Sequence, residues 1–175
     1  ALSTSYWPMA WPAPDEGSLA LEPSESYLDL PVFEEPLPDD ARPFSEPEHA
    51  APLETETLRE PHHERVVNHD IVSGETILWL VKDGGRQRFL HNQIEAEEAT
   101  TERYVIDDIN PLSARAEYTA HQVIGRGEWE TRTESNLTVT CSHESFFLDA
   151  KLTAYESDVE IFSRDWNTEI PRDGF

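Results

Sequence analysis

The chain has 175 residues and a formal net charge of −23, because 36 Asp and Glu residues outnumber 13 Lys and Arg residues. Such an acidic surface repels phosphate groups, which argues against nucleic-acid and membrane partners. The single cysteine, Cys141, excludes an intramolecular disulfide framework, and no apolar run has the length of a membrane-spanning helix.

The N-terminal stretch predicts a strand over residues 1–11 that runs into an aromatic corner. Three rings, Tyr6, Trp7 and Trp11, alternate there with prolines. The corner is either a stacking platform for a sugar or flat ligand, or a structural plug whose tryptophans fill the core. No polar residues converge on the rings in sequence, which favours the plug. Short strands are expected at 18–21 and 27–30.

Residues 31–64 predict an extended linker. This stretch is rich in acids, poor in large apolar groups, and holds seven prolines: Pro31, Pro36, Pro38, Pro43, Pro47, Pro52 and Pro61. Such a segment cannot bury enough apolar surface to fold alone. We expect it to run over a neighbouring surface, pinned there by Val32, Phe33, Phe44 and Leu53.

Residues 65–109 predict further strands separated by turns. A hairpin of 65–72 and 75–82 is closed by Ser73-Gly74. A turn at Asp83-Gly84-Gly85 leads into a strand over 86–91, and residues 92–101 form a strand edge or a loop. A strand over 102–109 ends at the Asn110-Pro111 break.

The stretch 114–166 carries the strongest pattern, an apolar–polar alternation over three or four long strands. A period of two is typical of a half-buried antiparallel sheet. One face is expected to hold Ala114, Ala116, Tyr118, Ala120 and Ile124 of the first strand, Trp129, Thr131, Thr133, Leu137, Val139 and Cys141 of the second, and Phe146, Leu148, Ala150, Leu152 and Ala154 of the third. The fourth strand covers 159–166.

These patterns together predict an all-β fold: a mainly antiparallel meander or sandwich, or a half-barrel sheet, behind a Pro-rich extended N-terminal segment. The predicted boundaries are a segment over 1–30, the linker over 31–64 and the sheet domain over 65–175. No long helix and no internal repeat is expected.

Catalytic and metal-binding signals are weak. The chain has no Gly-x-Ser-x-Gly elbow, Walker sequence, dinucleotide-type glycine pattern or His-Glu-x-x-His motif. His62, His63 and His69 lie close together in sequence, but their spacing lacks the paired ligands of a zinc site. Cys141 falls on the apolar face of a strand, which indicates an inert buried thiol. We therefore predict no catalytic residue, no metal and no cofactor.

Several blocks of the sequence resemble one known family in the same order. They are STSYWPMAWPAP at 3–14, LDLPV at 28–32, NPLSARAE at 110–117, GRGEWETRTES at 125–135 and TAYESDVEIFSRDWNTEIPRD at 153–173. The blocks resemble the C-terminal β-domain of CocE/NonD-type hydrolases, which are α/β-hydrolases related to cocaine esterase and Xaa-Pro dipeptidyl-peptidases. The resemblance spans nearly the whole chain.

The resemblance implies that residues 1–30 are the tail end of a jelly-roll-like β-domain, followed by an extra sheet. The family's catalytic Ser, Asp and His belong to an upstream α/β domain, and no position here matches them. The first hypothesis is therefore a non-catalytic accessory domain of a serine hydrolase, whose partner is that catalytic domain. The alternative is a free-standing lipocalin-like or carbohydrate-binding module. The N-terminus lacks a signal peptide, so we expect a cytoplasmic protein, with a homo-oligomer as one option.

Overall fold

The computed structural model describes residues 7–15, 17–18, 20–32 and 45–173, and the chain forms two units. The smaller unit covers 17–52. Its described residues are exposed and contain a turn at Glu22–Ser26 but no strand, so the predicted strand over 27–30 is wrong. The segment holds too little apolar surface to fold on its own.

The predicted anchors of the linker do not bury their side chains where they can be seen. Val32 is 77% exposed and Leu53 is 61% exposed, while Phe33 and Phe44 lie outside the described residues. The prediction that Val32 and Leu53 pin the linker down is therefore wrong.

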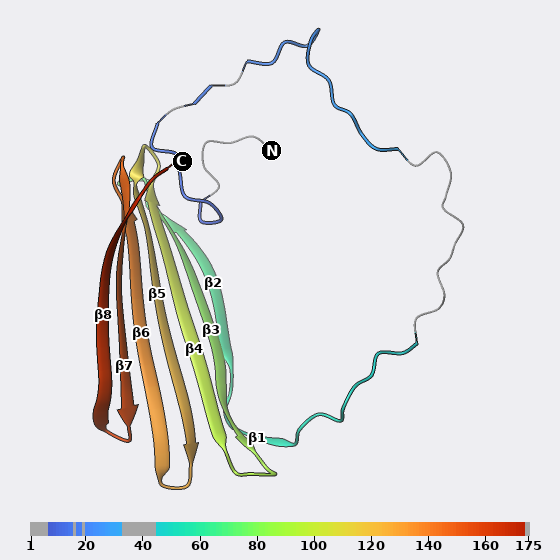
Figure 1. The fold of residues 1–175 in the computed structure, drawn as a ribbon, viewed down its shortest axis with the longest axis vertical. Helices are drawn as coiled ribbons and strands as arrows, with labels where there is room; N and C mark the ends of the chain where they lie inside the picture. Colours follow the sequence, from blue (N-terminus) through green and yellow to red (C-terminus); the bar gives the residue numbers. More distant parts are fainter. Residues whose placement is uncertain (1–6, 16, 19, 33–44, 174–175) are drawn as a thin grey trace. The chain divides into compact units, whose positions relative to one another are not determined.

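The larger unit is built around one antiparallel sheet of eight strands (Figure 1). The strands are β1 (Thr55–Arg59), β2 (His62–His69), β3 (Glu75–Phe89), β4 (Glu95–Asp107), β5 (Asn110–Arg126), β6 (Trp129–Cys141), β7 (Ser145–Glu156) and β8 (Val159–Pro171). From β3 to β8 each strand pairs with the next along the chain, so the sheet is a meander. The sheet is open and does not close into a barrel. The all-β, mainly antiparallel prediction is thus confirmed.

The sheet begins at Thr55 and so includes the last part of the predicted linker. β1 and β2 pair with different stretches of the same edge of β3, which makes them one edge strand in two pieces. Between the two pieces the chain passes Glu60 and Pro61, and proline cannot continue a hydrogen-bonded ladder.

The predicted turn at Gly84-Gly85 is wrong, because both glycines lie inside β3 at an irregularity in its pairing with β4. Gly85 has φ +73°, and a Cβ there would lie 2.3 Å from the carbonyl oxygen of Arg59. Only glycine tolerates this close approach of two backbones. The Gly-Gly pair therefore marks the place where the edge strand breaks, and β3 runs on to Phe89.

The buried apolar core is small. Among the described residues, the buried hydrophobic side chains are Val105, Ala114 and Val123, with Pro12 the largest that is fully enclosed. Most strand residues are only partly covered. The sheet therefore behaves as one layer, and its stability comes from partly buried rows of side chains on both faces.

Candidate functional site

The aromatic corner, Trp7 and Trp11, packs against the sheet. The two indole rings meet edge to face with their centroids 4.9 Å apart. Trp7 contacts the Tyr104 ring of β4 at 5.8 Å, and Trp11 contacts the Phe146 ring of β7 at 5.4 Å. Edge-to-face contacts place a positive ring edge against a negative ring face. Tyr6, the third predicted member, lies outside the described residues.

Arg172, which directly follows β8, connects the aromatic corner to the sheet. It is only 8% exposed. Its Nη2 donates to the carbonyl of Pro12 at 2.6 Å, and its Nη1 donates to the carbonyl of Ser142 at 3.1 Å. Its guanidinium also lies 4.8 Å from the centroid of the Phe146 ring. A buried cation needs such partners to replace its lost hydration. No local pattern in the sequence marks Arg172, because its partner Pro12 lies 160 positions away in the chain.

These contacts favour an anchor over a ligand platform. The rings of Trp7 and Trp11 are half-buried against other aromatic rings, whereas Met9, between them in the chain, is 91% exposed. A platform needs an open ring face with polar groups converging beside it. The anchor interpretation stays a prediction, which the stability of a Trp7→Ala variant tests.

One face of the sheet presents cross-strand rows of apolar side chains. In one row Tyr118 pairs with Leu137, Leu137 with Ala150, and Ala150 with Trp166. The residues of this apolar face are Ala116, Tyr118, Ala120, Leu137, Val139, Leu148, Ala150, Leu152, Ala154 and Trp166. None of them is fully buried. The alternation predicted from the sequence thus places these side chains together on one face, which remains partly open to solvent.

The opposite face carries charged side chains that neutralise one another. Arg59 donates to Asp83 at 2.9 Å and to Glu97 at 2.9 Å. Arg88 donates to Glu95 at 2.6 Å, and this hydrogen bond is the main cause that lowers the pKa of Glu95. The corresponding bond from Arg59 lowers the pKa of Asp83.

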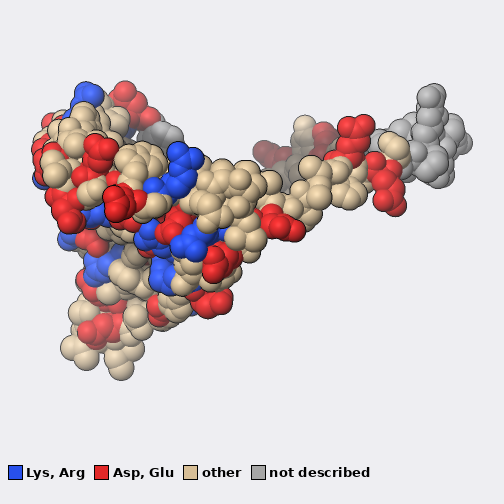
Figure 2. Space-filling view, turned by 90° about the horizontal axis from the view of Figure 1, so that it is seen from below, with Lys and Arg blue, Asp and Glu red and all other residues tan. Residues whose placement is uncertain are grey.

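A third arginine extends this network. Arg86 donates to Glu95 at 2.9 Å and to Glu130 at 2.7 Å. Figure 2, which views the molecule from below, shows Lys and Arg side chains lying among Asp and Glu side chains. Each of these three guanidinium groups already contacts carboxylates. The network therefore connects neighbouring strands, and none of the three groups is left to bind an anion.

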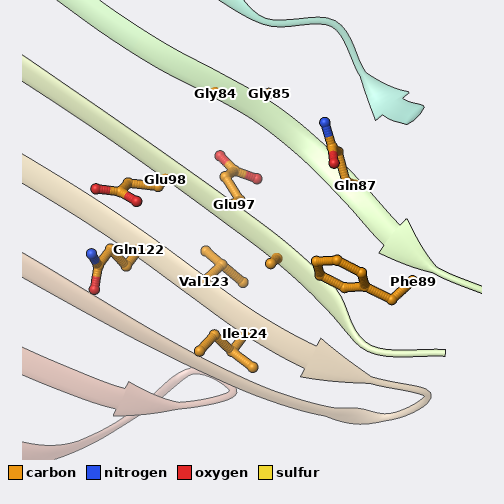
Figure 3. Close-up of a pocket in the computed structure, with 10 residues that line it drawn as sticks. Gly84, Gly85, Gln87, Phe89, Glu97, Glu98, Gln122, Val123 and Ile124 are labelled. Atoms are coloured by element: carbon orange, nitrogen blue, oxygen red, sulfur yellow. The ribbon is translucent and has the colours of Figure 1, made fainter. Parts of the chain in front are cut away.

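A depression of about 360 Å³ lies beside the Gly84-Gly85 irregularity (Figure 3). The residues that line it include the apolar Phe89, Val123 and Ile124 and the acidic Glu97 and Glu98 of β4. Glu97 is already bound by Arg59. The lining contains no Ser, Cys or His, so it offers no nucleophile paired with a base.

The histidines named in the sequence analysis do not converge. His62 lies 3.9 Å from Glu64, while His69 is hydrogen-bonded to the Thr76 hydroxyl at 2.8 Å. Among the residues that the structure describes, no group of three or more His, Cys, Asp or Glu side chains could hold a metal ion. Cys141 is half-buried, and its Sγ lies 3.8 Å from the carbonyl oxygen of Leu112.

No family model matches the chain, and neither the curated proteins nor the solved structures contain a significant match to it. Within the described part of the chain, no helix is long and apolar enough to cross a membrane. The resemblance to CocE/NonD-type hydrolases is therefore carried by the sequence blocks alone.

Proposed function

We propose that the chain is a non-catalytic accessory β-domain that packs, through its apolar face, on the α/β catalytic domain of a serine hydrolase acting on ester or amide bonds. The observation that carries the proposal is the partly exposed apolar face itself. A sheet with one apolar face gains stability when a second layer covers that face. Within the described residues, only the aromatic corner covers part of the sheet in this way.

The apolar face has the size of the apolar centre of a specific interface. Its residues lie on β5 to β8 and extend over at most seven positions of one strand, 148–154. With about 3.4 Å per residue and about 4.8 Å between strands, they cover roughly 24 Å by 14 Å. The resulting area of about 350 Å² is less than half of the about 800 Å² that each partner contributes to an interface of standard size, so polar side chains around it form the rim.

The choice of partner rests on the sequence blocks that resemble the C-terminal region of CocE/NonD-type hydrolases. In that family the catalytic residues belong to the α/β domain, which agrees with a chain that has no recognisable nucleophile motif. The catalytic domain is either part of the same protein or a separately encoded half. We expect the complex in the cytoplasm.

The alternative, a free-standing lipocalin-like or carbohydrate-binding module, has less support. A small-molecule site is normally a concave pocket that buries most of its ligand. The depression beside Phe89 lies on an open sheet, and no second layer of strands encloses it within the described residues.

A fluorophosphonate probe, which labels activated serines, tests the proposed function. The purified chain is expected to remain unlabelled. The species captured from source cells by an antibody to the sheet is expected to contain a labelled serine, either in a longer form of this chain or in a second polypeptide identified by peptide sequencing. A labelled serine within residues 1–175, or a captured 20.0 kDa species without any labelled partner, contradicts the proposal.

A matched pair of variants tests the docking face. Tyr118 lies on the apolar face and Thr119 follows it on the opposite face, and both side chains are exposed. Tyr118→Glu is expected to weaken binding of the catalytic domain at least about tenfold, because a carboxylate is buried without a partner. Thr119→Glu is expected to leave binding unchanged. Equal effects of the two substitutions contradict docking through the apolar face.

A further inference from the structure

β8 is an unprotected edge of the sheet. All of its residues are exposed except Trp166, which is half-buried, and no described strand pairs with its outer side. Val159 is 65% exposed, and Phe162 and Ile170 are each 46% exposed. The backbone N–H and C=O groups along such an edge form a template for another strand.

The two edges of the sheet differ in how they resist pairing. The β1–β2 edge is broken at Glu60-Pro61 beside the β3 irregularity. The pairing of β8 with β7 is irregular between Glu160 and Phe162, opposite Ala154 and Tyr155 of β7. β8 ends at Pro171, but Phe162–Ile170 pairs regularly with β7 and contains neither proline nor lysine. Proline, bulges and charged side chains, lysine above all, are the usual devices that block edge pairing. The stretch 162–170 contains no proline, lysine or bulge, and its three charged residues, Arg164, Asp165 and Glu169, are compatible with pairing when each faces an uncharged residue.

We propose that β8 pairs with β8 of a second copy of this chain, antiparallel and centred on Trp166, to form one continuous sheet across a two-fold axis. The axis is perpendicular to the sheet, so the apolar faces of both copies lie on the same side. Because residues opposite each other must share a face, the axis passes through a residue and not between two residues.

The side chains of β8 select the register. With the axis at Trp166, Trp166 faces its own copy, Asp165 faces Asn167, and Arg164 faces Thr168. At the ends, Phe162 faces Ile170 across the interface, and no two like charges are opposed. All residues of 162–170 are paired in this arrangement. Its centre continues the apolar row of Leu137, Ala150 and Trp166 into the second copy.

The neighbouring two-fold registers are disfavoured by charge. An axis at Asp165 places Asp165 against its own copy, and an axis at Asn167 places Asp165 against Glu169. Like charges directly opposite each other destabilise a strand pair. Charge complementarity therefore leaves the register centred on Trp166 as the one that pairs the whole stretch.

The net charge of −23 per copy gives this dimer an unusual salt dependence. Long-range repulsion between two acidic copies opposes association at low ionic strength, and salt screens that repulsion. The contacts across β8 are backbone hydrogen bonds and apolar pairs, which salt weakens little. The dissociation constant is therefore expected to fall as the salt concentration rises.

Analytical ultracentrifugation of the full chain, alone in solution, tests the proposal with two neighbouring lysine substitutions. Asn167→Lys places a lysine opposite Asp165 of the other copy at two symmetric positions, and it is expected to lower the dissociation constant about two- to tenfold. Thr168→Lys places a lysine opposite Arg164 of the other copy at two symmetric positions. This repulsion is expected to raise the dissociation constant at least about tenfold. Both positions are exposed in the single chain. Circular dichroism and thermal melting check that each variant folds.

Ile170→Lys gives a further test, because Ile170 faces Phe162 of the second copy and is itself 46% exposed in the single chain. It is expected to weaken the dimer whether or not Thr168→Lys folds. A chain that stays monomeric at about 1 mM in both low and high salt overturns the proposal. A dimer that Asn167→Lys and Thr168→Lys change in the same direction overturns the register, and a dimer that Ile170→Lys leaves unchanged overturns the β8 interface.

Discussion

Replacing Trp7 by alanine tests whether the aromatic corner stabilises the fold. The Trp7 ring is half-buried and contacts Trp11 and Tyr104 edge to face. A tryptophan buries about 150–250 Å², so losing roughly 150 Å² at ~25 cal/mol per Å² removes about 3–4 kcal/mol. The free energy of unfolding is therefore expected to fall by about 3–5 kcal/mol.

Thermal melting without ligand measures this change. For a chain of this size each kcal/mol lowers Tm by about 2–4 °C, so Trp7→Ala is expected to lower Tm by roughly 6–20 °C. Met9 provides the matched control, because it lies in the same turn and is 91% exposed. Met9→Ala is expected to leave Tm unchanged. An unchanged Tm for Trp7→Ala would refute the anchor and favour the ligand platform.

Two other predictions concern the backbone and the charge network. Gly85→Ala is expected to destabilise the fold by about 2–5 kcal/mol, since it combines a positive φ with a Cβ only 2.3 Å from the Arg59 carbonyl oxygen. Gly127→Ala, with φ +64° and open space around the Cβ, is expected to lose only about 1–2 kcal/mol, and similar losses for both in urea unfolding would contradict the steric argument. In an NMR titration, Glu95 is expected to show a pKa below its ordinary value of 4.5, and Arg88→Gln should raise that pKa. Because the folded-state pKa is lowered, the pair stabilises the fold above pH 4.5 and loses its contribution as the pH falls through the lowered pKa; a Glu95 pKa that Arg88→Gln does not move would contradict this.

The sequence by itself determined which side chains of the longest strands share a face. In β5, β6 and β7 the alternation predicted which side chains share a face, and the paired residues Tyr118, Leu137 and Ala150 lie in one row. A period of two fixes this outcome, because a shift of one residue would turn every apolar side chain to the other face. The sequence also predicted the turn at Ser73-Gly74, where Gly74 adopts φ +77° in the structure.

Only the tertiary structure decided which glycines turn the chain and what the aromatic corner touches. Gly84-Gly85 has the composition of a turn. In the fold, however, the carbonyl oxygen of Arg59 in the neighbouring strand lies close to Gly85, and both glycines belong to β3. The sequence left two interpretations of Trp7 and Trp11 open, and only the tertiary structure shows that their rings lie against Tyr104 and Phe146. Both outcomes depend on contacts between residues far apart in the chain, and local propensity carries no information about which distant segment fills the neighbouring space.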